Sequence, residues 1–262
     1  MGVNKYIGGV FMKIAVITGA SSGIGAEFTT CPDKDEQFDE IWVIARRKQR
    51  LESIQARAKV RVLPMDLTDE SSFEEYERLL REVKPEVAVL VNAGGFGYFG
   101  AFEEGSFRDQ LKMIDLNDRA LVAMTYITLE YMERGSRIYN MGSMSAIQPV
   151  PYINVYGATK AFVLSFSRAL NVELKGRGIQ VMAVCPYWVK TEFFDTAVKD
   201  DTVSDFNKFY TPQQVVARAI EDMKKGRDVS FCGFGTKMQR IAVKLLPHRL
   251  IMKMWCCQQG IK

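Results

Sequence analysis

The chain has 262 residues, a formal net charge of +4, an apolar share of 47% and a charged share of 25%. These proportions are typical of a globular protein and exclude a disordered or fibrous one, and the length suits one large domain or two small ones. So small and dispersed a positive charge gives no reason to expect a nucleic acid as partner.

The first segment, Met1–Phe11, lacks the basic start, long apolar stretch and small-residue cleavage site of a signal peptide. No apolar run in the sequence approaches the roughly 20 residues of a transmembrane helix. The five cysteines form no CxxC pair, and an odd number of them fits free thiols in a reducing compartment. We therefore expect a cytoplasmic protein.

Apolar, β-branched-rich runs alternate with helical stretches along most of the chain. The predicted strands are Lys13–Thr18, Ile41–Ala45, Val60–Leu63, Val87–Val91, Arg137–Met141, Gln180–Val184 and Asp228–Phe231. Helical periodicity is clearest in Ser72–Val83, Phe107–Arg134, Tyr156–Lys175 and Pro212–Lys225. Continuous apolar strands separated by helices indicate a parallel sheet covered on both faces. The pattern predicts an α/β fold with a doubly wound, Rossmann-type sheet of seven parallel strands in a single domain.

We expect a catalytic core over about 13–235 and a basic-amphipathic helical tail over 236–262. In Lys237–Trp255 basic residues alternate with apolar ones, and Pro247 should divide this segment into two short helices. Such a segment favours packing over a substrate entrance or against a second subunit, and peripheral contact with a membrane surface is the alternative.

Two helical stretches, Ala161–Leu174 and Met124–Met132, are apolar on nearly every side. A helix that is apolar all round needs a partner on its second face, either from the same chain or from another copy. We therefore predict a homodimer or homotetramer.

Three glycines separate the first predicted strand from the first helix. In Thr18-Gly-Ala-Ser-Ser-Gly-Ile-Gly25 the chain must turn sharply where a pyrophosphate would meet the N–H groups of a helix N-terminus. Glycines also serve ordinary tight turns, but their place after the first strand of a βαβ unit favours a dinucleotide. The predicted cofactor-binding residues of this turn are Gly19, Ser21, Ser22, Gly23, Ile24 and Gly25.

The end of the second predicted strand indicates which dinucleotide is bound. Ala45 stands where an acidic residue would hold a ribose 2′-hydroxyl, and Arg46 and Arg47 follow it. One charge-assisted contact contributes roughly 1.5–3 kcal/mol, so a single arginine can favour NADP about tenfold or more. Lys48 and Arg50 are expected to lie on the solvated start of the next helix. We predict NADP (NADPH), bound through Arg46 and Arg47, with Arg46 as the residue on which the preference chiefly rests.

Tyr156 and Lys160 lie four residues apart and so share one helical face. A phenol titrates near 10, and a neighbouring ammonium group favours the phenolate, so this spacing suits proton transfer. A tyrosine and a lysine can also fall at this spacing by chance.

The chain contains a single histidine, His248, so a histidine-based zinc site or Ser-His-Asp triad would have to use it. We predict no metal.

The TGxxxGxG turn and the YxxxK pair, in this order, resemble the classical short-chain dehydrogenase/reductase family from about Lys13 to Thr191, with a continuation to about Phe234. The resemblance implies that Ser143 hydrogen-bonds the substrate oxygen, with Ser145 the weaker candidate, and that Asn117 anchors a water behind Lys160. It implies adenine contacts for Asp66 and Leu67, a supporting element at Asn92, Ala93 and Gly94, and nicotinamide contacts for Pro186, Val189 and Thr191. Two residues depart from the family pattern: Val91 replaces a second asparagine, and Tyr187 replaces a glycine.

These residues predict an NADP-dependent oxidoreductase that transfers a hydride between the nicotinamide and a carbonyl or secondary alcohol, with Asn117, Ser143, Tyr156 and Lys160 as its catalytic residues. Aromatic residues are plentiful in the segments expected around the site, which favours an apolar ketone substrate. They are Phe96, Tyr98, Tyr152, Trp188, Phe193, Phe194, Phe206 and Phe209. Two alternatives stay open: an epimerase or dehydratase with the same Tyr156–Lys160 pair, and a catalytically idle NADP-binding regulator, which would be expected to lack part of this set.

Overall fold

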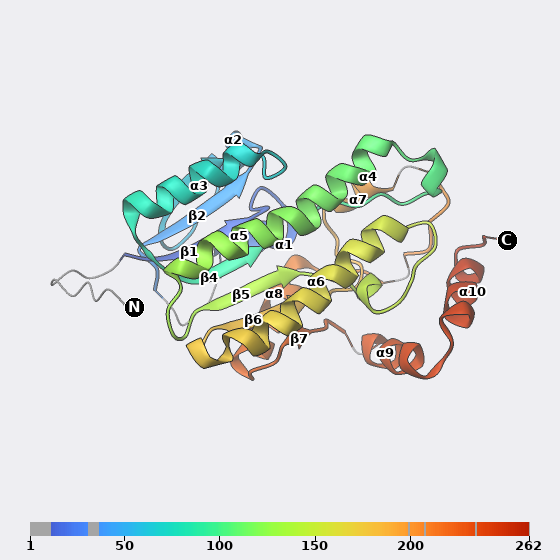
Figure 1. Cartoon of the computed structure of the whole chain (residues 1–262). Coiled ribbons are helices and arrows are strands. Elements are labelled where there is room, and N and C mark those ends of the chain that lie inside the picture. The colour runs from blue at the N-terminus through green and yellow to red at the C-terminus, as the bar shows by residue number, and fades with distance from the viewer. Residues whose placement is uncertain (1–11, 31–36, 199, 207, 234, 262) are drawn as a thin grey trace.

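The computed structural model describes residues 12–30, 37–198, 200–206, 208–233 and 235–261. The predictions about Met1–Phe11 lie outside the described residues. Seven parallel strands form one sheet in the order β3-β2-β1-β4-β5-β6-β7 (Figure 1). The strands are β1 (Lys13–Thr18), β2 (Glu40–Ala45), β3 (Lys59–Pro64), β4 (Glu86–Asn92), β5 (Arg137–Met141), β6 (Gln180–Val184) and β7 (Val229–Ser230). The predicted fold class is confirmed, although the last strand is shorter than expected.

Helices cover both faces of the sheet. They are α1 (Gly23–Thr30), α2 (Lys48–Glu52), α3 (Glu70–Val83), α4 (Phe107–Ile114), α5 (Ala120–Thr128), α6 (Asn154–Glu173), α7 (Phe193–Ala197), α8 (Pro212–Lys224), α9 (Gly235–Leu245) and α10 (His248–Gln258). α3, α5 and α6 lie in front of the sheet in Figure 1, and α1 and α8 lie behind it. None of the helices in the described part of the chain combines the length and apolar content needed to cross a membrane.

Alternate residues of each strand enter two separate cores, as the period of two in a strand requires. In β1, Ile14 and Val16 pack in the core that contains side chains of α3, α5 and α6. Ala15 and Ile17 pack in the core on the other face, with side chains of α1 and α8. All four are fully buried. This double burial explains why the strands are apolar at every position.

The predicted helix Phe107–Arg134 is irregular. Its regular parts, α4 and α5, are joined by a π-helical turn over Asp115–Arg119, and a 3-10 turn at Leu129–Tyr131 ends it. A π turn inserts an extra residue into the helix and is frequent at functional sites. Here it contains Asn117, which is buried within the turn.

The tail forms α9 and α10, which Pro247 separates as expected. It packs against the loops at the carboxyl end of the sheet. The Trp255 indole Nε1 donates a hydrogen bond to the Pro151 carbonyl at 3.0 Å. The Gln259 Oε1 accepts from the backbone N–H groups of Ser204 and Asp205, both at 3.0 Å. The tail therefore fixes the segments that follow β5 and β6.

Candidate active site

The glycine turn between β1 and α1 lies close against the backbone that follows β4. Gly19 has a φ of +65°, and a Cβ built there would lie 2.5 Å from the Ala93 carbonyl oxygen. A Cβ on Gly25 would lie 2.4 Å from the Gly19 carbonyl oxygen. No side chain fits at either place, so both positions require glycine for the turn to pack this closely. Such a cradle fits the pyrophosphate of a dinucleotide.

Two buried polar networks hold β4 beside this turn. The Thr18 Oγ1 accepts hydrogen bonds from the N–H groups of Ala93 and Gly94, both at 3.1 Å. The Asn92 Nδ2 donates to the Asn140 Oδ1 at 2.9 Å and to Thr125 at 3.0 Å. Asn92 is thus a structural support for the edge of the site, as the family resemblance implied. Ile24 packs partly buried against the core on the α1 and α8 face.

The two arginines after β2 have different surroundings. The Arg47 Nη2 donates to Ser22 Oγ at 2.9 Å and to Ser21 Oγ at 3.0 Å. Arg46 is 72% exposed, and its nearest partner is the Asp66 carboxylate, at 3.8 Å. Arg47 therefore lies beside the phosphate-binding turn, whereas Arg46 points toward the loop after β3. Arg50, expected on a solvated surface, is half-exposed and paired with Glu192.

Asp66 and Leu67 follow β3, beside Arg46. The Asp66 Oδ1 accepts hydrogen bonds from the backbone N–H of Thr68 at 3.0 Å and from its hydroxyl at 2.8 Å, which fixes this loop. Leu67 is buried in the core beneath it. A buried apolar side chain and an anchored carboxylate suit the edge of an adenine site.

Ser143, Tyr156 and Lys160 meet at the carboxyl ends of β5 and β6. Tyr156 hydrogen-bonds Ser143 through its side chain, and the Lys160 Nζ lies 5.6 Å from the centre of the Tyr156 ring. Lys160 donates to the Met141 carbonyl at 2.7 Å, so its buried ammonium is held in place by the last residue of β5. The backbone N–H of Ser145 donates to the Ser143 Oγ at 3.2 Å, which orients that hydroxyl.

The Asn117 side chain hydrogen-bonds the backbone of the loop after β4. Its Oδ1 accepts from the Phe96 N–H at 3.1 Å, and its Nδ2 donates to the Phe96 carbonyl and to the Thr159 hydroxyl, both at 3.0 Å. A Cβ on Gly95 would lie 2.9 Å from the Asn117 Oδ1 and 3.5 Å from the Lys160 Nζ. Asn117 thus fixes the loop after β4 against α6, with Gly95 closely packed beside Lys160.

Burial controls the protonation of Tyr156 and Lys160. Burial raises the pKa of Tyr156 to about 12, and the hydrogen bond from Ser143 opposes this only in part. Burial lowers the pKa of Lys160 to about 8, against the attraction of the Asp118 carboxylate. The pKa of Tyr156 therefore lies above its ordinary value in the polypeptide alone, whereas the expected lowering involves both the Lys160 ammonium and the oxidised nicotinamide; desolvation of the phenolate is the largest cause. Tyr156 is a neutral phenol at neutral pH.

The segment after β6 reaches back to the glycine turn. The Pro186 carbonyl accepts from the Met144 N–H at 3.0 Å, beside Ser143. Val189 is buried and forms an isolated bridge with Tyr210. A Cβ on Gly23 would lie 3.1 Å from the Thr191 Cγ2, so Thr191 contacts the phosphate-binding turn. Tyr187, which replaces the family glycine, packs against Trp188 with ring centres 5.5 Å apart.

An aromatic cluster covers Tyr156. Phe193 and Phe99 lie over its ring, with centres 5.5 Å and 5.9 Å away. Trp188 packs on Phe99, and Trp255 of the tail packs on Trp188 at 6.4 Å. Of the eight aromatic residues expected around the site, seven belong to this apolar cluster: Phe96, Tyr98, Tyr152, Trp188, Phe193, Phe194 and Phe206. The eighth, Phe209, contacts Phe194.

Two residues near the site carried no signal that the motifs could reveal. Asp118 is a half-buried carboxylate whose Oδ1 has no hydrogen-bond partner among the described residues, and burial raises its pKa to about 7 while Lys160 opposes this. Glu192 directly follows the last residue of the PxxVxT-like segment and reaches the arginines after β2. Its position next to Thr191 was the available hint, but its partners lie more than 140 residues earlier.

Comparison with known proteins gives the same picture. The family model for short chain dehydrogenase matches residues 13–202. The chain is 30% identical over 249 residues to 17-beta-hydroxysteroid dehydrogenase type 3 of Rattus norvegicus, covering 90% of this chain and 77% of that protein.

Two solved structures are similar over 92% of the chain. A short-chain dehydrogenase from Sphingobium yanoikuyae in complex with NADPH has a TM-score of 0.76 and 28% identity, with 95% of it covered. A bulky-bulky ketone specific alcohol dehydrogenase from Comamonas testosteroni has a TM-score of 0.71 and 25% identity, with 93% of it covered. The motifs, the fold and the extent of these matches agree: the chain belongs to the short-chain dehydrogenase family of oxidoreductases.

Proposed function

We propose that the protein is an NADP-dependent oxidoreductase that reduces an apolar ketone to a secondary alcohol. The observation that carries this proposal is the meeting of Ser143, Tyr156 and Lys160 at the end of the sheet that also holds the glycine turn. The free thiols of Cys185 and Cys232 are buried and fit a reducing compartment such as the cytoplasm. A panel of ketones and alcohols, followed by the absorbance of NADPH, tests the proposal.

The bound nicotinamide would supply the hydride. The glycine turn would hold the pyrophosphate, Lys160 the ribose, and Thr191 with Val189 and Pro186 the nicotinamide end. Ser143 and Tyr156 would both hydrogen-bond the substrate oxygen, and Tyr156 would give its proton to that oxygen. A buried phenol with a pKa of about 12 starts the reaction in the protonated state that reduction needs. Asn117 and Gly95, which pack beside Lys160, would line the route by which a proton returns to Tyr156.

The apolar character of the substrate rests on the aromatic cluster. Phe193 packs on Tyr156, and Phe194 and Trp188 pack in turn beside Phe193 and each other. Trp255 of the tail extends the same cluster. A similar protein is described as specific for bulky-bulky ketones, and another as a hydroxysteroid dehydrogenase, which supports a large apolar ketone here.

The pH dependence of reduction should follow Lys160. Its pKa of about 8 lies below the ordinary value, so the ammonium is present below pH 8 and lost above it. We expect reductive kcat/KM to be flat near neutral pH and to fall about tenfold per pH unit well above pH 8. Asp118 stabilises this ammonium, so Asp118→Asn should move the falling limb to lower pH.

The matched control is Asp115→Asn, which removes a carboxylate from the same π-helical turn. Asp115 is 44% exposed and faces Arg119, so its loss should leave the limb in place. If the fall of kcat/KM above pH 8 stays at the same pH in Asp118→Asn, the coupling between Asp118 and Lys160 is contradicted.

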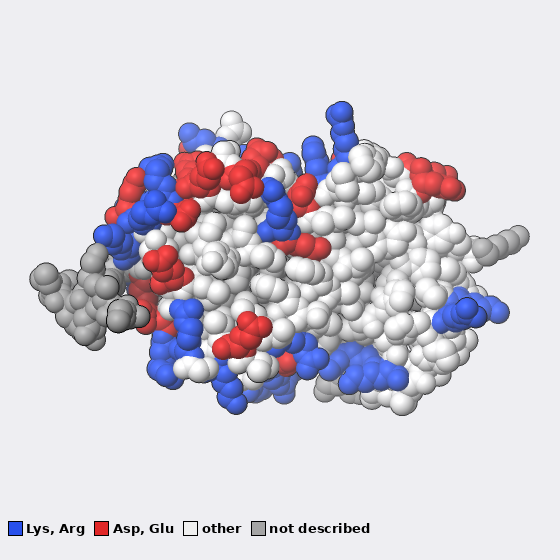
Figure 2. Space-filling model, viewed as in Figure 1, with Lys and Arg blue, Asp and Glu red and all other residues white. Residues whose placement is uncertain are grey.

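We propose that the face formed by α5 and α6 binds a second copy of the chain. Figure 2 shows a largely uncharged area over these helices, with charged residues gathered toward its rims. A cavity of about 510 Å³ lies there, lined by Val122, Tyr126 and Phe162 together with acidic residues of α3. Tyr126 is 80% exposed. Exposed apolar side chains on two neighbouring helices are typical of a homodimer interface.

Light scattering tests this interface. We expect the wild type to have twice the mass of the 29.7 kDa chain. Tyr126→Glu should give the single-chain mass, because a charge buried in an apolar interface has no partner. Leu245→Glu is the control, since Leu245 is 77% exposed on α9 of the tail. A monomer produced by Leu245→Glu and not by Tyr126→Glu would place the interface on the tail.

A further inference from the structure

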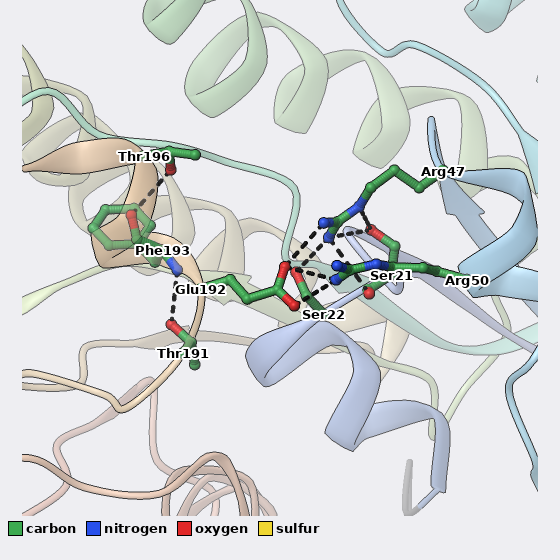
Figure 3. Close-up of polar contacts among 8 residues, drawn as sticks. All are labelled: Ser21, Ser22, Arg47, Arg50, Thr191, Glu192, Phe193 and Thr196. Carbon is green, nitrogen blue, oxygen red and sulfur yellow. Dashed lines mark hydrogen bonds and ion pairs between the residues drawn. The ribbon is translucent and has the colours of Figure 1, made fainter.

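Glu192 joins two parts of the proposed cofactor site that are distant in sequence. Its carboxylate lies 2.9 Å from the Arg47 Nη1, and it also accepts from the Arg50 Nη1, with the Oε2 at 2.6 Å (Figure 3). Arg47 and Arg50 follow β2, whereas Glu192 follows β6. We call these three residues the Glu192 bridge.

Hydrogen bonds to Glu192 and to two serines use nearly all of the N–H donors of Arg47. Its Nε and Nη2 donate to Ser21 Oγ at 3.2 Å and 3.0 Å, and Nη2 also donates to Ser22 Oγ at 2.9 Å. The remaining nitrogen, Nη1, donates to Glu192. Two guanidinium groups and two hydroxyls beside a glycine turn form a site for an anion. In this structure the Glu192 carboxylate is that anion.

Glu192 is well suited to that position. The hydrogen bonds from Arg50 and Arg47 hold the pKa of Glu192 below its ordinary value, so it is ionised throughout the neutral range. The three side chains are about half-exposed, at 45%, 47% and 47%. Ion pairs this exposed contribute little net free energy, so another anion can replace the carboxylate.

We propose that Glu192 competes with the 2′-phosphate of NADP for Arg47 and Arg50, and so sets the affinity and selectivity for the phosphorylated cofactor. The inference rests on the proposed NADP dependence. A phosphate brings more charge and more acceptor oxygens than one carboxylate, so it can displace Glu192 from both guanidinium groups.

The position of Glu192 in the chain gives the exchange a route to the catalytic residues. Phe193, the next residue, packs on the Tyr156 ring at 5.5 Å. The Phe193 N–H donates to the Thr191 Oγ1 at 3.3 Å, and the Phe193 carbonyl accepts from Thr196 at 3.0 Å (Figure 3). Glu192 therefore belongs to the same compact segment that covers Tyr156.

The test is Glu192→Gln, which removes the charge and keeps the shape. Dissociation constants are measured by calorimetry for NADPH, NADH, adenosine 2′,5′-bisphosphate and adenosine 5′-monophosphate. We expect NADPH and the bisphosphate to bind about two- to fivefold more tightly, the range of an exposed ion pair. NADH and the monophosphate should bind unchanged. In an Arg47→Ala background, Glu192→Gln should have a much smaller effect.

Glu82→Gln is the matched control. Glu82 is 56% exposed and pairs with Arg78 at 2.8 Å on α3, so the variant changes the net charge equally and should leave all four constants unchanged. The same NADPH affinity in Glu192→Gln, or an equal gain for NADH, would overturn the inference. The wild type's own preference between NADPH and NADH tests the proposed cofactor separately. A wild type that prefers NADPH together with an inert Glu192→Gln would refute only the role of Glu192.

Discussion

In Tyr156→Phe the turnover number should fall about 10²- to 10⁴-fold, because that is the usual contribution of a positioned general acid. The substitution removes only the hydroxyl that hydrogen-bonds Ser143. The ring stays in its place between Phe99 and Phe193, so the fold and the covering cluster should persist. The affinity for NADPH should be nearly unchanged. Steady-state kinetics on the best ketone and calorimetry with NADPH measure the two quantities.

Tyr76→Phe separates the loss of a buried hydroxyl from the loss of a proton donor. The Tyr76 hydroxyl is buried far from the site and hydrogen-bonds the Thr128 hydroxyl at 2.8 Å. Its removal should lower the free energy of unfolding by about 1 kcal/mol and leave turnover intact. Tyr156→Phe with more than a tenth of the wild-type turnover would refute the proton-transfer role. A wild type that binds NADPH but turns over no ketone or alcohol would favour the idle, NADP-binding alternative.

The fold was predictable because burial on both faces leaves a direct trace in the sequence. β1, β4 and β6 are apolar at successive positions, and the structure buries almost every one of them. The family resemblance identified Asn117 as a candidate site residue, but its position in a π-helical turn could not be predicted from the sequence. Within that turn Asn117 accepts a hydrogen bond from Phe96, which lies 21 residues earlier in the chain.

Other features of the site depend on the tertiary structure alone. Arg46 and Arg47 are neighbours with the same chemistry, and only the course of the chain after β2 decides which one lies against Ser21 and Ser22. The pKa of Tyr156 likewise depends on burial by residues from several loops. A motif fixes which groups are present, whereas desolvation fixes their charge.

Arg47→Ala should weaken the binding of NADPH about 10- to 150-fold, the range of one charge-assisted hydrogen bond, and leave NADH nearly unaffected. Arg47 is the arginine whose guanidinium lies beside the glycine turn, at 2.9 Å from Ser22 and 3.0 Å from Ser21. A 2′-phosphate in that site would lose its principal cation in the variant. Calorimetry with NADPH and NADH, for wild type and variant, gives the ratio of affinities directly.

Arg46→Ala is the matched control, because it removes the same charge one residue earlier. Arg46 is 72% exposed and has only Asp66 within ion-pair distance among the described residues, at 3.8 Å, so its loss should weaken NADPH binding much less. A larger effect in Arg46→Ala than in Arg47→Ala would assign the phosphate to Arg46 instead. An equal loss for NADPH and NADH in Arg47→Ala would mean that Arg47 supports the turn through Ser21 and Ser22 and does not select the phosphate. The two variants together therefore test whether, under the proposed NADP dependence, the arginine that the fold directs toward the phosphate-binding turn is the one that selects the phosphate.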